Sequence, residues 1–190
     1  MEPFSEAIKA TIDTAIALLT AYDNQKERFF DRHIDPLYQR MVLIHKDYMA
    51  AFTQIERHVE TKTTPEEELI EFLRTRQAEF YSERGLARFI AESLGDAERR
   101  PIRSDTWYEI KRFCSCVADY FRAASDGGDI THFSALIDAA IENFASAAIT
   151  GGAPRAHLEL LQSIRIATRD LPDRFDAISK SYAKLERDLL

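Results

Sequence analysis

Hydrophobic residues recur every three to four positions along almost the whole chain, and no stretch shows the alternation of a β-strand. This spacing places apolar side chains on one face of a helix. The first such stripe runs from about Phe4 to Arg32, and a second runs from Pro36 to about Thr61. We therefore predict an all-α protein, a bundle of six or seven long and mostly antiparallel helices.

The dipeptide Asp35-Pro36 separates the first two stripes. Aspartate is a favoured N-cap, because its carboxylate accepts a hydrogen bond from a backbone N–H that has no helical partner. Proline suits the first helical position, since it has no N–H to leave unpaired. The pattern predicts that the chain breaks near His33 and that a new helix begins at Pro36.

The second helix carries a heptad-like seam that contains a histidine. The members alternate in steps of four and three: Ile34, Tyr38, Met41, His45, Tyr48, Phe52, Ile55 and Val59. A buried histidine must find a hydrogen-bond partner or stay neutral, and Tyr22 or Asp47 could serve. We interpret His45 as a core residue. The alternative is that His45, Tyr48 and Met41 line a ligand pocket.

Turn-forming and capping residues predict where later helices begin and end. A third helix ends at Gly95, and Thr106 with Glu109 forms a capping box that opens a fourth. The polar loop 96–103 between them is the best candidate for a boundary. We predict a single helical domain over residues 1–190, with possible sub-bundles 1–95 and 104–190 joined by that loop.

A fifth helix is expected to end at about Thr150, and the last segment of the chain is long. Pro172 is predicted to kink or split this segment. Beyond Pro172 the apolar residues again step by four and three, with charges between them. This seam could fold back on the bundle or pair with another chain. As candidate interface residues it contributes Phe175, Ile178, Tyr182, Leu185 and Leu189.

The net charge of −7 and the pI of about 5.3 argue against a surface built for phosphate backbones, so we expect no duplex DNA partner. The sequence contains no P-loop, no dinucleotide-binding glycine motif, no H-E-x-x-H and no G-x-S-x-G. No glutamate stands three residues before a histidine, as a di-iron bundle would require. We therefore expect no metal and no cofactor.

The N-terminal residues lack the basic region of a signal peptide, and no run of 18 apolar residues is present. These features predict a soluble, cytoplasmic protein without a membrane partner. Cys114 and Cys116 are two positions apart, so on a helix their side chains point away from each other. We expect both to be reduced thiols, since a disulfide between them would have poor geometry.

Two segments read R-x4-H: Arg28 to His33 and Arg40 to His45. On an all-helical chain this motif resembles the nuclease motif of the HEPN superfamily, whose members are often metal-independent ribonucleases. The resemblance implies that Arg28, His33, Arg40 and His45 are catalytic and that two protomers bring them together. Histidine would exchange the proton of the 2′-hydroxyl, and arginine would stabilise charge on the phosphate.

Our leading prediction is a non-enzymatic protein that acts through protein–protein interaction, as a scaffold or adaptor or by self-association. Its partner would be another protein or further copies of the same chain. One alternative is a HEPN-like ribonuclease acting as a toxin or defence effector, with RNA as its partner. The other is a helical sensor domain that binds a small apolar or aromatic ligand.

Overall fold

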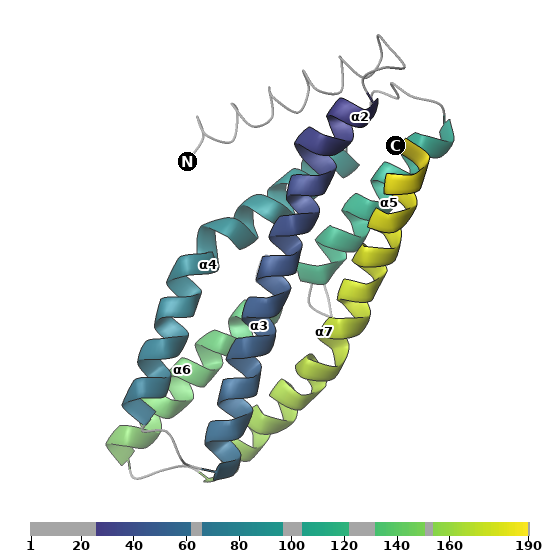
Figure 1. Cartoon of the computed structure of the whole chain (residues 1–190). Coiled ribbons are helices and arrows are strands. Elements are labelled where there is room, and N and C mark those ends of the chain that lie inside the picture. The colour runs from purple at the N-terminus through teal and green to yellow at the C-terminus, as the bar shows by residue number, and fades with distance from the viewer. Residues whose placement is uncertain (1–25, 62–65, 97–103, 122–131, 151–153, 190) are drawn as a thin grey trace. The chain divides into compact units, whose positions relative to one another are not determined.

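The computed structural model describes residues 26–61, 66–96, 104–121, 132–150 and 154–189, and these residues are almost entirely helical, with no strand among them (Figure 1). The elements are α2 (Lys26–Phe29), the π-helical turn η2 (Phe30–Ile34), α3 (Asp35–Thr61), α4 (Glu66–Gly95), α5 (Ser104–Phe121), α6 (His132–Thr150) and α7 (Pro154–Leu189). The predicted all-α class is confirmed. Most of the first predicted helix lies outside the described residues.

The helix ends predicted at Thr61, Gly95 and Thr150 are confirmed by α3, α4 and α6. Within the described ranges, no helix combines the length and the apolar character needed to cross a membrane.

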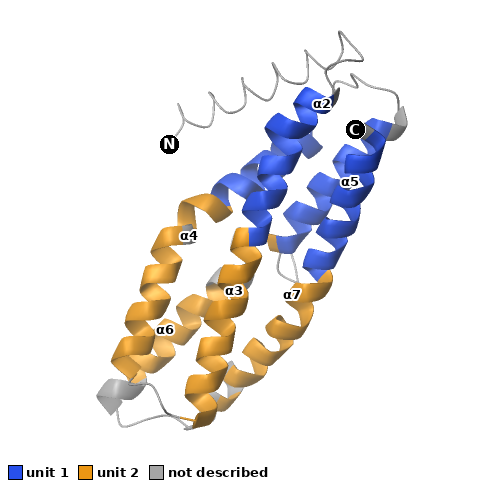
Figure 2. Ribbon diagram, viewed as in Figure 1, with its two compact units in different colours: residues 1–42, 85–120, 174–190 blue, residues 43–84, 121–173 orange. Residues whose placement is uncertain are grey.

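The chain forms two compact units (Figure 2). Unit 1 consists of residues 1–42, 85–120 and 174–190, and unit 2 of residues 43–84 and 121–173. Each unit therefore takes stretches from both sides of the polar loop 96–103. Helices α3, α4 and α7 contribute to both units, whereas α6 lies in unit 2 and nearly all of α5 in unit 1.

An aromatic cluster joins α3 and α7 in unit 1. The rings of Tyr38 and Tyr182 stack with centroids 3.9 Å apart, and Phe30 approaches Tyr182 at 5.4 Å. The Tyr182 hydroxyl donates to Asp35 Oδ1 at 2.8 Å, and the Tyr38 hydroxyl donates to Ser179 Oγ at 3.3 Å. Burial, together with the nearby Asp35 carboxylate, raises the pKa of Tyr182. The cluster thus packs apolar ring faces while satisfying both phenol groups.

Unit 2 is held together by contacts from α3 to α6 and from α4 to α6. The buried His58 ring of α3 forms a T-shaped contact with the Phe144 ring of α6, with centroids 5.1 Å apart and planes at 82°. On α4, Gln77 donates a hydrogen bond to the Asp138 carboxylate of α6. Large apolar side chains of α3, among them Phe52 and Ile55, are fully buried.

The junction that was predicted to break near His33 is a continuous helix. The Asp35 N–H donates to the carbonyl of Phe30, five residues earlier, so the backbone passes through a π turn into α3. In a regular α-helix the ring of Pro36 would collide with the carbonyl four residues before it. The wider π turn accommodates the proline without ending the helix. The α-helix α3 does begin at Asp35, but the predicted break near His33 and the N-cap role of Asp35 are wrong, because the π turn runs into α3 without interruption.

The buried stripe of α3 follows a different register from the predicted seam. Its steps of three and four run through Ile34, Leu37, Met41, Ile44, Tyr48, Ala51, Ile55 and His58, all of which are buried. The predicted and observed stripes share every seventh residue, and the predicted Phe52 is also fully buried, whereas the predicted Tyr38, His45 and Val59 are only half-buried. His45 therefore lies at the flank, half-buried, and Ile44 takes the central position.

Two other sequence features have roles that differ from those predicted. Thr106 is the third residue of α5, so it is not the N-cap, and Glu109 is buried and paired with Lys184 of α7. Pro172 lies inside α7, which continues through it to Leu189. The prediction of a capping box is therefore wrong. A split of the helix was one of the two outcomes predicted at Pro172, and the helix is not split there.

Cys114 and Cys116 are free thiols, as predicted, and they differ in exposure. Burial raises the pKa of the Cys114 thiol to about 12, and it raises the pKa of the half-buried Cys116 as well. Because the thiolate is the reactive form, we expect only Cys116 to react with Ellman's reagent in the native protein at about pH 8. Its rate should be below that of an unstructured thiol.

In denaturant both thiols should react, and Cys116→Ser should remove the native reaction. Two thiols that react natively at the same rate would contradict the burial of Cys114.

Candidate functional site

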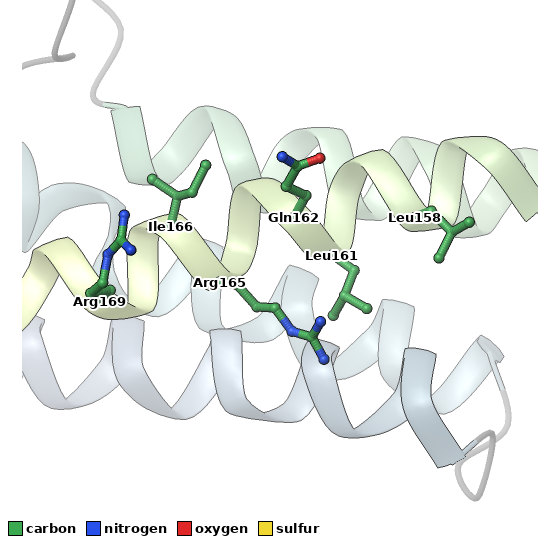
Figure 3. Close-up of a pocket in the computed structure, with 6 residues that line it drawn as sticks. All are labelled: Leu158, Leu161, Gln162, Arg165, Ile166 and Arg169. Carbon is green, nitrogen blue, oxygen red and sulfur yellow. The ribbon is translucent and has the colours of Figure 1, made fainter.

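A shallow groove with a volume of about 610 Å³ follows the face of α7 in unit 2. Its six lining residues are Leu158, Leu161, Gln162, Arg165, Ile166 and Arg169 (Figure 3). They fall in two rows with steps of four, one row beginning at Leu158 and the other at Leu161. Residues four apart on a helix lie on the same face, one turn above the other.

The apolar part of the groove is accessible to solvent. The side chains of Leu158 and Ile166 are 64% and 49% exposed, whereas Leu161 is buried. Figure 3 shows Gln162 and Ile166 along one edge of α7 and Leu161 and Arg165 along the other. Large apolar side chains placed in this way on a helix surface mark a candidate binding face.

The charged lining of the groove is basic. Arg165, whose side chain is 54% exposed, donates from Nε to Glu56 at 3.0 Å and from Nη2 to Glu60, both on α3. Arg169, one turn further along α7, is also exposed. None of the lining residues is acidic. The groove therefore joins exposed apolar side chains to two arginines, of which Arg165 is already paired with the Glu56 and Glu60 carboxylates.

Sequence reasoning did not find this face. The apolar residues that it selected on α7 lie beyond Pro172 and do not line the groove: Phe175, Ile178, Tyr182, Leu185 and Leu189. The groove residues are visible in the sequence as a second stripe of α7, at positions i, i+3, i+4, i+7, i+8 and i+11 counted from Leu158. It mixes leucine and isoleucine with arginine and glutamine, so a search for purely apolar faces passes over it.

The four residues of the two R-x4-H segments are divided between the two units. Arg28 is exposed, and the half-buried His33 ring lies 5.0 Å from that of Phe29. Burial, and secondly the charge of Arg32, lowers the pKa of His33. These residues belong to unit 1, as does the half-buried Arg40, whereas His45 belongs to unit 2.

The three candidate ligand-binding residues are mostly core. Tyr48 and Met41 are fully buried, and Tyr48 packs on Phe52 with ring centroids 5.9 Å apart. His45 is half-buried, and burial lowers its pKa. The neutral imidazole is therefore favoured at neutral pH.

A buried ion pair beside Tyr48 is a second feature that sequence reasoning missed. Asp47 of α3 accepts a hydrogen bond from Arg84 of α4 at 2.5 Å, and their side chains are only 1% and 4% exposed. The Arg84 guanidinium also lies over the Tyr48 ring, 4.4 Å from its centroid. Arg76 approaches Asp47 Oδ1 at 3.7 Å.

Burial raises the pKa of Asp47, and the two arginines oppose that rise. The sequence suggested Asp47 as a hydrogen-bond partner for His45. The Asp47 carboxylate instead contacts two arginines of α4, Arg76 and Arg84. Two features of the sequence point to this pair. Asp47 stands within the apolar face of α3, and Arg84 stands three residues before the buried Ala87 of α4.

The predicted interface residues after Pro172 lie in unit 1. Ile178 and Leu185 are buried there, and Phe175 and Tyr182 are half-buried. The Phe175 ring stacks on Tyr38 of α3 with centroids 6.2 Å apart. The side chain of Leu189 lies outside the described residues. This part of α7 is therefore packed against its own chain in unit 1.

Comparison with known proteins identifies no relative: no family model, no curated protein and no solved structure matches this chain. Within the ranges that the structure describes, no group of three or more histidine, cysteine, aspartate or glutamate side chains could hold a metal ion. The candidate site is therefore judged on its own chemistry, and the α7 groove combines exposed apolar side chains with charged ones.

Proposed function

We propose that this protein is a non-enzymatic helical-bundle protein that works by binding another protein through the α7 groove. The observation that carries the proposal is the exposure of Leu158 and Ile166 beside the basic side chains of Arg165 and Arg169. Exposed large apolar side chains with a polar rim are characteristic of protein-binding surfaces.

The structure adds no comparable support to the other two candidates. Metal-independent RNA cleavage needs histidine and arginine to converge on one phosphate. Within one chain His33 contacts Phe29 and Arg28 is exposed, so convergence at either motif would depend on a second protomer. A small-ligand sensor needs space beside its lining residues. Met41 and Tyr48 are closely covered by protein.

Site-specific photo-cross-linking in the cells that naturally make the protein tests this proposal. A photoreactive amino acid at Gln162, which is exposed in the middle of the groove, should give covalent adducts of defined mass with another protein. The same amino acid at Tyr108, which is 64% exposed on α5, is the control and should give none. Combining the Gln162 probe with Leu158→Arg and Ile166→Arg should abolish the adducts.

Two results would count against the proposal. One is an adduct pattern at Gln162 that does not differ from that at Tyr108 or that survives the two arginine substitutions. The other is cleavage of total RNA in EDTA by the wild-type protein that is lost in His33→Ala or His45→Ala, which would make the ribonuclease the better reading.

A further inference from the structure

We propose that α4 and α7 each contain a flexible joint, at Gly85 in α4 and at Pro172 in α7, where the helix bends in solution. This motion is a property of the fold and does not depend on what binds the α7 groove. Helices α3, α4 and α7 each pass from one unit into the other within their length, as the colours of Figure 2 show. The crossing lies between Arg84 and Gly85 in α4 and between Asp173 and Arg174 in α7. A glycine and a proline therefore stand beside two of these three crossings.

Glycine and proline are the two residues least favoured in the interior of a helix. In the part of the chain that the structure describes, Gly95 ends α4 and Pro154 begins α7, where such residues are well tolerated. The π turn accommodates Pro36. Gly85 and Pro172 are the remaining glycine and proline of the described helices, and both stand beside a unit boundary.

Packing does not require a glycine at position 85. A Cβ added at Gly85 would meet no side chain and no backbone of another element within 4 Å, so alanine would fit there. The residue is exposed and its backbone is helical, so no turn or close approach explains it. Glycine has more backbone freedom than any other residue. What it changes at this position is the stiffness of α4.

Two features weaken the turn of α7 that precedes Pro172. Proline has no N–H, so it cannot donate the helical hydrogen bond to the carbonyl of Thr168, four residues earlier. The Thr168 hydroxyl donates to the carbonyl of Ile164 at 2.8 Å, and such bonds from threonine often bend a helix. Pro172 lies on the exposed side of α7, where carbonyls tilt outward to water as a helix curves.

Helix α3 provides an internal comparison, because it passes between the units without a glycine or a proline. Its crossing lies between Val42 and Leu43. Met41 and Ile44, on either side of the crossing, are fully buried. We therefore expect α3 to be stiff where α4 and α7 bend.

Double electron–electron resonance on the full chain tests the proposal, with spin labels attached to unnatural amino acids so that both cysteines stay unmodified. Each of three label pairs spans one crossing, with the two sites 18 residues apart: Thr75 and Ser93 in α4, Gln162 and Lys180 in α7, and Gln39 and Arg57 in α3. At 1.5 Å per residue each pair is roughly 27 Å apart. The distance distributions of the α4 and α7 pairs should be broader than that of the α3 pair.

Removing each joint should stiffen its own helix. Gly85→Ala should narrow the α4 distribution to the width of the α3 distribution and slow amide hydrogen exchange around residue 85 about fivefold, because alanine favours the helix. Pro172→Ala should narrow the α7 distribution in the same way. Ser82→Ala and Asp173→Ala, at exposed positions near the two joints, are the matched controls and should leave both widths unchanged. Circular dichroism establishes that each variant is folded.

Three distributions of equal width in the wild-type protein would overturn the proposal. A broad distribution in only one of α4 and α7 would also overturn it, as would a width that Gly85→Ala or Pro172→Ala leaves unchanged. Equal narrowing by Ser82→Ala and Gly85→Ala would assign the breadth to helix propensity in general and not to a joint. Cross-linking at Gln162 is independent of these results, so failure of the joints leaves the binding function standing.

Discussion

Replacing Arg84 with methionine is expected to lower the free energy of unfolding by about 3–5 kcal/mol, because it leaves the buried Asp47 carboxylate without its closest cation. Arg76, at 3.7 Å and 38% exposed, is too distant and too hydrated to replace it. Urea denaturation followed by circular dichroism measures the change. Arg74→Met, at an exposed position of the same helix, is the control and should alter stability by about 0.5 kcal/mol at most.

Removing both charges should behave differently from removing one. Burial raises the pKa of Asp47 although both arginines oppose that rise, and replacing a buried ion pair by apolar residues of similar volume is often neutral or stabilising. Asp47→Leu combined with Arg84→Met should therefore restore most of the stability that the single variant loses. A double variant as unstable as the single one would contradict this account.

The same pair has a defined pH dependence. Because the folded-state pKa of Asp47 is raised above that of the unfolded chain, the folded state binds more protons between the two values. The stability contributed by this group is complete below the unfolded value, which is about 4, and is lost as pH rises through the folded value. The double variant should lack this part of the pH profile.

Ile44→Ala is expected to lower the free energy of unfolding by about 2–5 kcal/mol, since Ile44 is fully buried at the centre of the α3 stripe. Leu43→Ala, at the neighbouring position where leucine is 57% exposed, should change it by about 0.5 kcal/mol or less. Denaturation midpoints of the two variants decide between the registers of α3. A larger loss for His45→Ala than for Ile44→Ala would restore the predicted seam and contradict the observed one.

The helix class and several helix ends followed from the sequence because they depend on local signals. Gly95 ends α4 where it was expected, and the apolar period of α3 persists to Thr61. Asp35-Pro36 misled the prediction because the same dipeptide fits a helix start and a π turn within a helix. The helical backbone angles of Asp35 and its hydrogen bond to the carbonyl of Phe30 distinguish the two.

The register of α3 could not be settled from the spacing. Steps of four and three and steps of three and four both begin at Ile34 and both pass through Met41, Tyr48 and Ile55. The choice between Ile44 and His45 depends on which side of α3 its neighbours cover, and this is a tertiary property. Isoleucine is the better core residue than His45, but the observed stripe contains His58 where the predicted one has Val59, so burial cost does not separate the two stripes.

The ion pair and the groove were missed for different reasons. Asp47 and Arg84 are 37 residues apart in sequence, and only the packing of α3 on α4 brings them together. The groove residues are close in sequence, but whether Leu158 and Ile166 are covered depends on the neighbouring helices. Local periodicity identifies a helix face and does not state what lies against it.

The sharing of α3, α4 and α7 between the two units has a consequence for how this chain can be divided or recombined. Unit 1 is assembled from three separate stretches of sequence and unit 2 from two. Excising one continuous fragment would therefore yield neither unit whole, and grafting one into another protein would require several joins. Gene fusion and exon shuffling, which move continuous segments, must transfer both units together.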